Sequence, residues 1–285
     1  MPELPEVETT VRMIRPHLVG RRIAGTEVDW ERTLGGQGPD DFRRVVTGAR
    51  IAAVSRRAKY IRIDLTRRGK PAGSVVVHLR MTGRLMVDPL EDPTPDYRRV
   101  SLRLDNEVPG RGVLHFVDVR KFGRFTFHAN ADEALAHLGP EPLEDDFTAE
   151  WLRQALGSRQ RAVKPLLLDQ AFLAGLGNIY VDESLFLAGV HPQRRSDRIP
   201  KDRVVRLHEA IQAILRQAIE REGSSFDSFY RTPEGQPGSY QHQFRVYGRE
   251  GRPCRTCERP IVRIVVGQRG THFCSRCQPV PRARK

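Results

Sequence analysis

The sequence predicts an α+β protein, in which an antiparallel β-sandwich or barrel flanked by helices is followed by a helical domain and a small metal-bound hairpin. Three observations predict this fold class. Short strand-like segments fill residues 21–128, helical periodicity dominates from residue 151, and two Cys-x-x-Cys pairs stand near the C-terminus. A chain of 285 residues is long enough for two domains that each bury a core.

The opening residues predict a helix. Pro5 suits a first helical position, and Glu6 and Glu8 suit the positive end of the helix dipole. Apolar residues then recur at helical spacing, namely Val7, Val11, Ile14 and Leu18.

The strand-like region shows short apolar segments, some alternating with period two, separated by turn-like stretches such as GGQGPDD, RRGKPAGS and EDPTPD. Such segments without long helices between them favour an antiparallel sandwich or barrel. The predicted strands are 22–30, 51–56, 60–65, 74–79, 100–104, 114–119 and 124–128.

The domain boundaries follow from composition. We expect an N-terminal β-domain over 1–136, a Pro-rich and acidic linker over 137–150, a helical domain over 151–243 and a metal-binding tail over 244–285. The helical domain ends in a long loop, 223–243, that is rich in Gly, Ser, Pro and Gln. The predicted helices are 151–156, 162–169, 179–188 and 202–222, the last with one face formed by Val205, His208, Ile211, Leu215, Ala218 and Ile219.

The charge balance suggests a polyanionic partner. Lys and Arg number 48 against 35 Asp and Glu, which gives a net charge of +13. Nucleic acid would release counterions on binding such a surface, although a generally basic protein without that partner is equally compatible with charge alone. The chain has no apolar stretch long enough for a membrane span, and its acidic start lacks the apolar core of a secretory signal. We therefore expect a cytoplasmic protein with reduced cysteines.

Those cysteines predict a zinc site. Cys254 and Cys257 form one pair, Cys274 and Cys277 the other, and the residues between the pairs can form a hairpin. Four thiolates leave no open position for a substrate, so we expect one structural Zn²⁺. The tail 244–285 carries eleven basic and two acidic residues, and Arg269 at the expected hairpin turn could reach phosphate or remain solvated.

The N-terminus offers a nucleophile. Removal of Met1 would expose Pro2 as a secondary amine, and an α-amino group with a pKa near 8 is partly neutral at about pH 7. Attack on a sugar anomeric carbon would give an iminium, and Glu3 could move protons beside it. Met-Pro-Glu by itself is a common start and does not establish this chemistry.

A resemblance to a known family supports this chemistry more strongly than the first three residues do. The opening MPELPEVETT resembles that of the formamidopyrimidine-DNA glycosylases, the Fpg or MutM family of bacterial 8-oxoguanine DNA glycosylase/AP lyases. The likeness continues in order along nearly the whole chain through RRAKY, HLRMTG, KFGR, HLGPEPL, GLGNIY, VYGREGRPC and the terminal cysteines.

The resemblance implies a bifunctional enzyme of base excision repair. Pro2 would displace the damaged base and form the Schiff base, Glu3 would move protons, Glu6 matches a second acidic position, and Lys59 would contact the phosphate near the reacting sugar. Successive β- and δ-elimination would then cut the strand. The implied substrate is double-stranded DNA with oxidised purines (8-oxoguanine, formamidopyrimidines) or abasic sites, with no organic cofactor.

Enzymes of this family also insert side chains into the gap that the everted nucleotide leaves in the base stack. Met81, Arg120 and Phe122 match the residues that do this, although without the resemblance a core position would be favoured for Met81 and Phe122. Val119 and Lys121 stand where the family commonly has proline and arginine, and Arg80 stands where it has glycine. These departures put loop stiffness and opposite-base preference in question, and leave the chemistry intact.

Further DNA contacts are implied by a helix–two-turn–helix element. Lys164 and Asn178 would bind phosphates from that element, although Asn178 would also suit a helix cap. Arg269 matches the finger arginine placed beside the reacting nucleotide and is grouped with the catalytic residues. The loop residues assigned to closure over the base are Ser224, Ser225 and Tyr247.

Two other functions remain open at this point. One is the related branch resembling endonuclease VIII, which prefers oxidised pyrimidines, although the set of Met81, Arg120 and Phe122 favours the purine branch. The other is a non-catalytic zinc protein that binds DNA or RNA, against which Pro2, Glu3 and Lys59 argue. A hydrolase using Asp and His is weaker, because no Gly-x-Ser-x-Gly or HExxH motif occurs. We expect a monomer in the bacterial cytoplasm, associated with the nucleoid.

Overall fold

The computed structural model describes residues 1–105, 111–226 and 230–280. It divides into two compact units, one formed by 1–137 together with 221–239, the other by 138–220 together with 240–285. The final residues of the predicted basic tail, 281–285, and part of the predicted loop 223–243 lie outside the described residues. Residues 221–239 group with the N-terminal unit, so most of the predicted loop 223–243 falls there, whereas 240–243 group with the helical unit.

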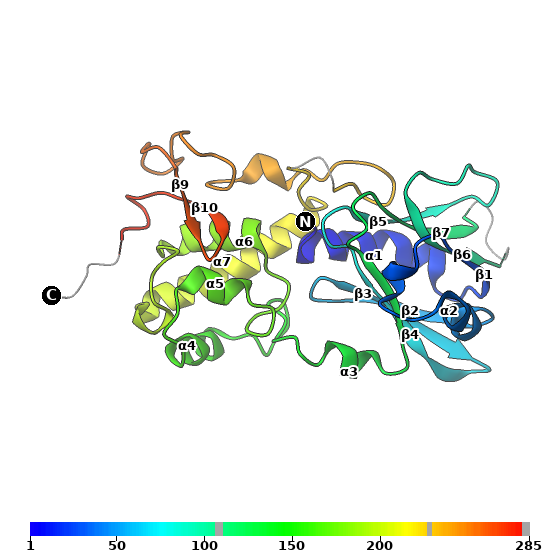
Figure 1. The fold of residues 1–285 in the computed structure, drawn as a ribbon. Helices are drawn as coiled ribbons and strands as arrows, with labels where there is room; N and C mark the ends of the chain where they lie inside the picture. The colour runs from blue at the N-terminus through cyan, green and yellow to red at the C-terminus, as the bar shows by residue number, and fades with distance from the viewer. Residues whose placement is uncertain (106–110, 227–229, 281–285) are drawn as a thin grey trace. The chain divides into compact units, whose positions relative to one another are not determined.

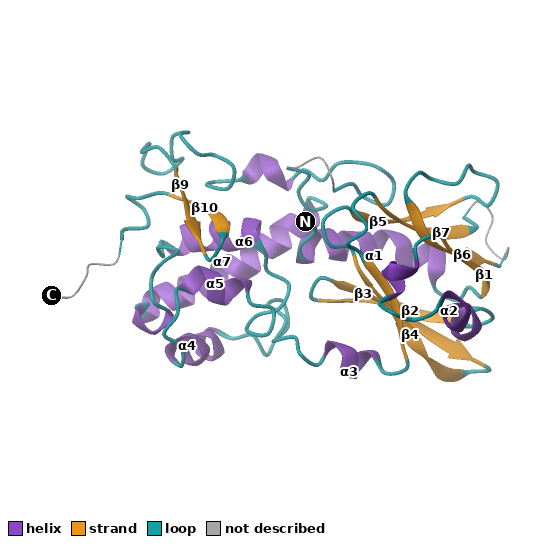
Figure 2. Ribbon diagram, in the orientation of Figure 1, coloured by secondary structure: helices purple, strands orange, loops and turns teal. Residues whose placement is uncertain are grey.

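Two four-stranded antiparallel sheets form the first unit, with strand orders β1-β6-β7-β5 and β2-β3-β4-β8 (Figures 1 and 2). This confirms the predicted antiparallel sandwich. The strands are β1 (Ile23–Val28), β2 (Arg50–Arg57), β3 (Tyr60–Arg67), β4 (Lys70–His78), β5 (Gly83–Asp88), β6 (Arg98–Leu104), β7 (Val113–Asp118) and β8 (Arg124–His128).

Two helices cover the open edges of these sheets. Helix α1 (Leu4–Leu18) packs against the edge strands β2 and β5, and helix α2 (Pro39–Val46) packs against the opposite edge strands β1 and β8. Both sheets and both helices contribute to one apolar core, in which the Phe116 and Phe125 rings lie 5.8 Å apart. The covered edges cannot recruit another strand, and α1 is fixed at both sheets. The residues at the N-terminus are therefore attached directly to a helix that both sheets hold in place.

The second unit is built from helices. Helix α7 (Lys201–Glu220) packs on α4 (Ala149–Gly157) and α6 (Asn178–Ala188), and α5 (Val163–Leu168) packs on α6. The predicted buried face of α7 is wrong at Val205, which is exposed, whereas Val204 and Leu207 are buried. The short helical segments are α3 (Ala131–Leu135) in the first unit, η1 (Glu31–Leu34), η2 (Ser196–Arg198) and η3 (Tyr240–Gln243).

The cysteine-rich tail contains a hairpin of β9 (Val262–Val266) and β10 (Arg269–Phe273). Gly267 and Gln268 form its turn, both with positive φ of 55° and 61°, as a two-residue turn between twisted strands requires. Arg269 is therefore the first residue of β10, paired with Val266, and its side chain is exposed.

No helix within residues 1–105, 111–226 and 230–280 combines the length and the apolar content of a membrane span.

Candidate active site and nucleic-acid interface

The predicted nucleophile lies at the buried start of α1. Pro2 and Glu3 directly precede the helix and are both buried. The backbone N–H of Glu3 donates to the Glu6 carboxylate at 2.8 Å, which fixes the chain just before the first turn. Pro2 is thus held in one place by its neighbours, as a nucleophile must be.

Glu6 also binds the segment 221–239. Its other carboxylate oxygen accepts from the backbone N–H of Ser224 at 2.8 Å, and its backbone carbonyl lies 3.5 Å from the Tyr230 hydroxyl. Burial and the nearby Glu6 charge raise the pKa of Tyr230 above its ordinary value, so this hydroxyl keeps its proton. Gly223, with φ of +78°, has no room for a side chain, because a Cβ would lie 2.8 Å from Glu6. One carboxylate therefore joins the residues beside Pro2 to the predicted lesion-closing loop.

Lys59 lies in the turn between β2 and β3, and its side chain is buried. Helix α1 holds this turn through Arg56, whose guanidinium donates to Glu8 at 3.0 Å and to the Ala58 carbonyl at 3.1 Å. Although burial opposes ionisation of Glu8, the hydrogen bonds and charges of Arg12 and Arg56 keep its pKa below the ordinary value. Sequence reasoning did not find the Glu8–Arg56 pair, because nothing local links a helix acid to a strand arginine 48 residues away.

His78, at the end of β4, is close to Lys59. Burial first, and then the positive charges of Arg80 and Lys59, lower the pKa of His78 to about 3. The neutral ring accepts the backbone N–H of Arg80 at its Nδ1, 2.9 Å away, and packs edge-on against Tyr60. His78 therefore shapes the turn that leads to Met81, where Arg80 adopts a positive φ of 54°, a conformation that favours glycine.

The three predicted gap-filling residues lie in two loops of the first unit. Met81 is 37% exposed and Phe122 is 50% exposed, which contradicts a core role for either. The Arg120 guanidinium lies over the Phe122 ring at 5.0 Å. Asp118 joins the two loops, because its buried carboxylate accepts from the Thr82 hydroxyl and from the backbone N–H of Gly123.

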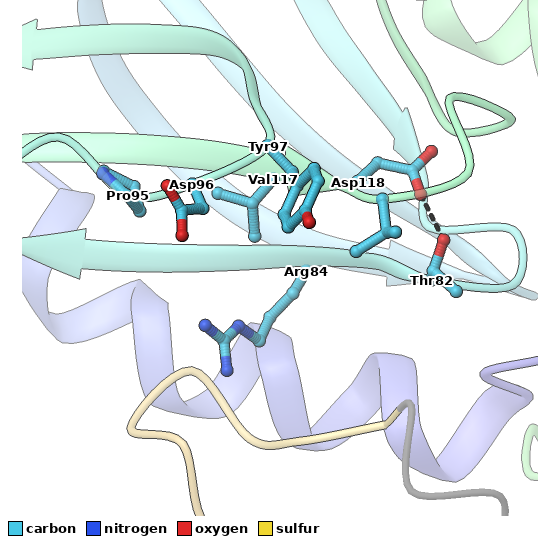
Figure 3. Close-up of a pocket in the computed structure, with 8 residues that line it drawn as sticks. Thr82, Arg84, Pro95, Asp96, Tyr97, Val117 and Asp118 are labelled. Carbon is cyan, nitrogen blue, oxygen red and sulfur yellow. Dashed lines mark hydrogen bonds between the residues drawn. The ribbon is translucent and has the colours of Figure 1, made fainter.

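A cavity of about 360 Å³ is lined by residues of β5 and β7, by residues 95–97, and by Thr82 and Val119 of these two loops (Figure 3). Figure 3 shows the Thr82–Asp118 hydrogen bond at its margin and the Arg84 side chain directed towards α1. None of the residues predicted to be catalytic lines this cavity. It is therefore distinct from the predicted position of chemistry.

In the helical unit, two predicted DNA ligands bind the hairpin. The Lys164 ammonium and the Asn178 side-chain amide both donate to the Gly270 carbonyl, at 3.1 and 3.0 Å. Lys164 is fully buried and forms an ion pair of 2.7 Å with Asp182, whose second oxygen accepts the His272 N–H. The predicted Lys164–phosphate contact is at odds with this burial, since a side chain without exposed surface cannot reach DNA. Lys164 instead fixes the strand that begins with Arg269.

Asn178 is the first residue of α6, and Gly177 takes the N-cap position. The asparagine is therefore not the cap. It is partly exposed, so a phosphate contact remains a prediction.

Tyr247 lies beside the hairpin in the second unit, apart from Ser224 and Ser225 in sequence and in unit. Its ring packs against Phe244 at 5.6 Å and His272 at 5.1 Å. Buried Glu183 accepts the backbone N–H groups of residues 245–247, and burial raises its pKa despite these bonds. Tyr247 is thus held firmly, and its predicted contact with DNA stays a prediction.

The four cysteines form a metal site. Their Sγ atoms all lie within 4.8 Å of one another, with Cys257 and Cys274 at 3.4 Å and Cys254 and Cys277 at 3.9 Å. A tetrahedron with Zn–S bonds of about 2.3 Å requires roughly 3.8 Å between sulfurs, so the cluster fits one Zn²⁺. The set is closed, which makes the ion structural, and Gln278 next to it donates to the Val190 carbonyl and ties the finger to the end of α6.

Three family models match the chain in succession. They describe the formamidopyrimidine-DNA glycosylase N-terminal domain over residues 1–125, the formamidopyrimidine-DNA glycosylase H2TH domain over 138–229 and the zinc finger found in FPG and IleRS over 251–280. The chain belongs to the formamidopyrimidine-DNA glycosylase family. It is thus a base-excision-repair glycosylase with a zinc finger, and AP lyase activity is characteristic of this family.

Relatives confirm the assignment over the full length. The formamidopyrimidine-DNA glycosylase of Symbiobacterium thermophilum is 43% identical, covering 99% of this chain and 90% of its own. That of Chloroflexus aggregans is 45% identical, covering 98% of each. Among solved structures, a Lactococcus lactis FPG mutant in complex with Fapy-dG-containing DNA has a TM-score of 0.87 at 34% identity, covering 98% of this chain and 100% of its own. MutM with carbocyclic 8-oxo-G-containing DNA has a TM-score of 0.87 at 33% identity, with the same coverage.

Proposed function

We propose that this glycosylase excises oxidised purines, 8-oxoguanine and formamidopyrimidines, from double-stranded DNA and cuts the strand through a Schiff base on Pro2. The observation that carries the proposal is the buried first turn, in which Glu6 holds the backbone at Glu3 and at Ser224. A fixed amine next to two buried carboxylates suits covalent attack with local proton transfer.

The reaction begins once Met1 is removed. The Pro2 nitrogen bonds to C1′ of the damaged nucleotide, the bond from C1′ to the base breaks, and the base leaves with that electron pair. The nitrogen then gives up its own proton, which neutralises the departing base, and the freed electron pair forms the C1′=N bond of an iminium. The sugar ring opens in this step as O4′ takes a proton, which Glu3 is placed to supply. Loss of a C2′ proton then expels the 3′ phosphate, and a second elimination expels the 5′ phosphate. Lys59 would stabilise the departing phosphate charge.

Eversion of the nucleotide leaves a gap in the base stack. Met81 and Phe122 expose apolar surface that can enter such a gap, and Arg120 can hydrogen-bond the unpaired partner base. Solved structures of relatives hold DNA with Fapy-dG and with carbocyclic 8-oxo-G, which correspond to the oxidised purines of this proposal, and DNA with an abasic site.

In the helical unit, Asn178, Tyr247 and Arg269 are the proposed DNA contacts. Arg269 is exposed at the tip of a hairpin whose backbone is fixed by Lys164 and Asp182. The relatives named above are bacterial, and we place the enzyme on chromosomal DNA in the cytoplasm.

Borohydride trapping on a duplex with 8-oxoguanine opposite cytosine tests the proposal. The wild-type enzyme should give a covalent adduct, and mass spectrometry should locate it on Pro2 of a chain that lacks Met1. Pro2→Gly should lower trapping and strand cleavage strongly and leave affinity for DNA unchanged. Pro5→Ala is the matched control, because it changes a neighbouring proline and leaves the amine in place.

Trapping by a chain that retains Met1 would overturn the proposed nucleophile. The lesion preference is tested separately with thymine glycol, since one relative's structure holds DNA with an oxidised pyrimidine. Faster excision of thymine glycol than of 8-oxoguanine would place the chain with the pyrimidine enzymes.

A further inference from the structure

The loop that carries Arg120 and Phe122 contains a residue in an unusual conformation. Lys121 lies between them with φ of +61°, in the left-handed region that non-glycine residues rarely adopt. Its ammonium lies 4.0 Å from the centre of the Trp30 ring, which follows β1. The Arg32 guanidinium lies 5.8 Å from the same ring. An exposed lysine thus makes a specific contact with the body of the first unit.

The ends of this loop are fixed independently of Lys121. The Asp118 carboxylate accepts the backbone N–H of Arg120 at 3.3 Å and that of Gly123 at 2.7 Å. Gly123 packs so closely on Phe116 that a Cβ would lie 2.4 Å from its ring. Between these ends the Lys121 N–H donates to the Asp118 carbonyl at 3.4 Å, a long hydrogen bond. The contact of the Lys121 side chain with Trp30 is a second restraint on the middle of the loop.

We propose that Lys121 is a positioning residue, whose contact with Trp30 fixes the left-handed turn that presents Arg120 and Phe122 together. The inference rests on the proposed function, since it assigns these two side chains to the gap in DNA. Lys121 then serves the interface without itself binding phosphate.

Binding to two duplexes tests this role. One duplex contains a tetrahydrofuran abasic analogue opposite cytosine, and the other is undamaged and of the same sequence. Lys121→Ala and Trp30→Leu should each weaken binding to the lesion duplex by about two- to fivefold, the range that a cation–π contact supports. Binding to the undamaged duplex should not change, because no gap is filled there.

Three controls separate positioning from other roles. Lys121→Arg keeps a cation over the ring and should restore wild-type binding. The double variant Lys121→Ala/Trp30→Leu should be no weaker than either single variant, because both remove the same contact. Lys70→Ala, which removes an exposed lysine from β4 of the same unit, should leave both affinities unchanged.

The dependence of DNA affinity on salt concentration distinguishes positioning by Lys121 from direct binding of phosphate by Lys121. If Lys121→Ala weakens binding to both duplexes and reduces the salt slope by about 0.9, while Trp30→Leu has no effect, Lys121 binds phosphate directly and the inference is wrong. Wild-type affinity in both single variants would also overturn it. Failure of the proposed function would differ from either result, because the wild-type enzyme would then give no trapped adduct.

Discussion

Replacing Lys164 by methionine tests how much the buried Lys164–Asp182 ion pair contributes to the stability of the helical unit. Neither side chain of the Lys164–Asp182 pair has exposed surface, and their charged atoms lie 2.7 Å apart. Methionine fills a similar volume but leaves Asp182 with a buried charge and no cation at this contact. Removing one partner from such a pair costs about 3–5 kcal/mol, and the remaining hydrogen bond from the His272 N–H offsets only part of this.

The chain offers a clean reporter for this loss. It has two tryptophans, Trp30 in the first unit and Trp151 in α4 of the second. In a Trp30→Phe background, urea unfolding followed by Trp151 fluorescence reports the helical unit alone. Lys164→Met should lower its unfolding free energy by about 3 kcal/mol or more. Adding Asp182→Asn should recover most of this, because no lone charge then stays buried.

DNA binding then distinguishes support from contact. A lysine that neutralises a phosphate contributes about 0.9 to the slope of log affinity against log salt. Because Lys164 is buried, Lys164→Met should leave this slope unchanged, and affinity should fall only as the strand carrying Arg269 loosens. If Lys164→Met reduced this slope by about 0.9 and left the unfolding free energy unchanged, Lys164 would bind DNA directly, and its assignment as a buried support would be refuted.

Two more predictions concern stability and the metal. The folded state of His78 has a pKa of about 3 against about 6.5 in the unfolded chain, so the unfolded state takes up the extra proton and stability falls as pH drops below about 6.5. For this residue the loss of unfolding free energy is about 2 kcal/mol between pH 7.5 and pH 5. In His78→Asn, Oδ1 can replace Nδ1 as the acceptor, so the difference between the unfolding free energies measured at the two pH values should shrink by this amount. An unaltered pH dependence would contradict a neutral buried ring. Cys257→Ser should lower the zinc content, measured by atomic absorption, and should also weaken DNA binding, because β9 and β10 connect the two pairs of ligands. Full affinity for DNA without the metal would show that the finger does not contact DNA.

Strand and helix patterns were sufficient for most of the fold. The alternation in residues 60–65 led to β3, and the spacing of the cysteines led to the metal site now matched by a zinc-finger family model. Helix α2 was missed because its start resembles a turn. Pro39 with Asp40 and Asp41 is equally typical of a first helical turn, and only the burial of Phe42 and Val46 against the sheets decides between the two.

The sequence nominated candidate site residues, but it did not predict the partners that hold them. Pro2 and Glu3 were assigned by resemblance, and the structure adds that both are buried at a fixed helix start. Lys164 was assigned to a phosphate contact by resemblance, whereas the structure shows its side chain fully buried. Its partner Asp182 lies 18 residues further along the chain, and no local pattern joins the two.

Four buried acids share one physical role. Glu6, Asp118, Asp182 and Glu183 are all at most 2% exposed, and each accepts backbone N–H groups in a segment predicted to face DNA. Hydrogen bonds to a charged acceptor are worth about 1.5–3 kcal/mol, more than bonds between neutral groups. In a chain with a net charge of +13, acids on the interface itself would repel phosphate. Burying them below it lets the same charges stiffen the backbone while arginines and lysines occupy the surface, so the rigidity of the interface and its attraction for DNA come from opposite charges at different depths.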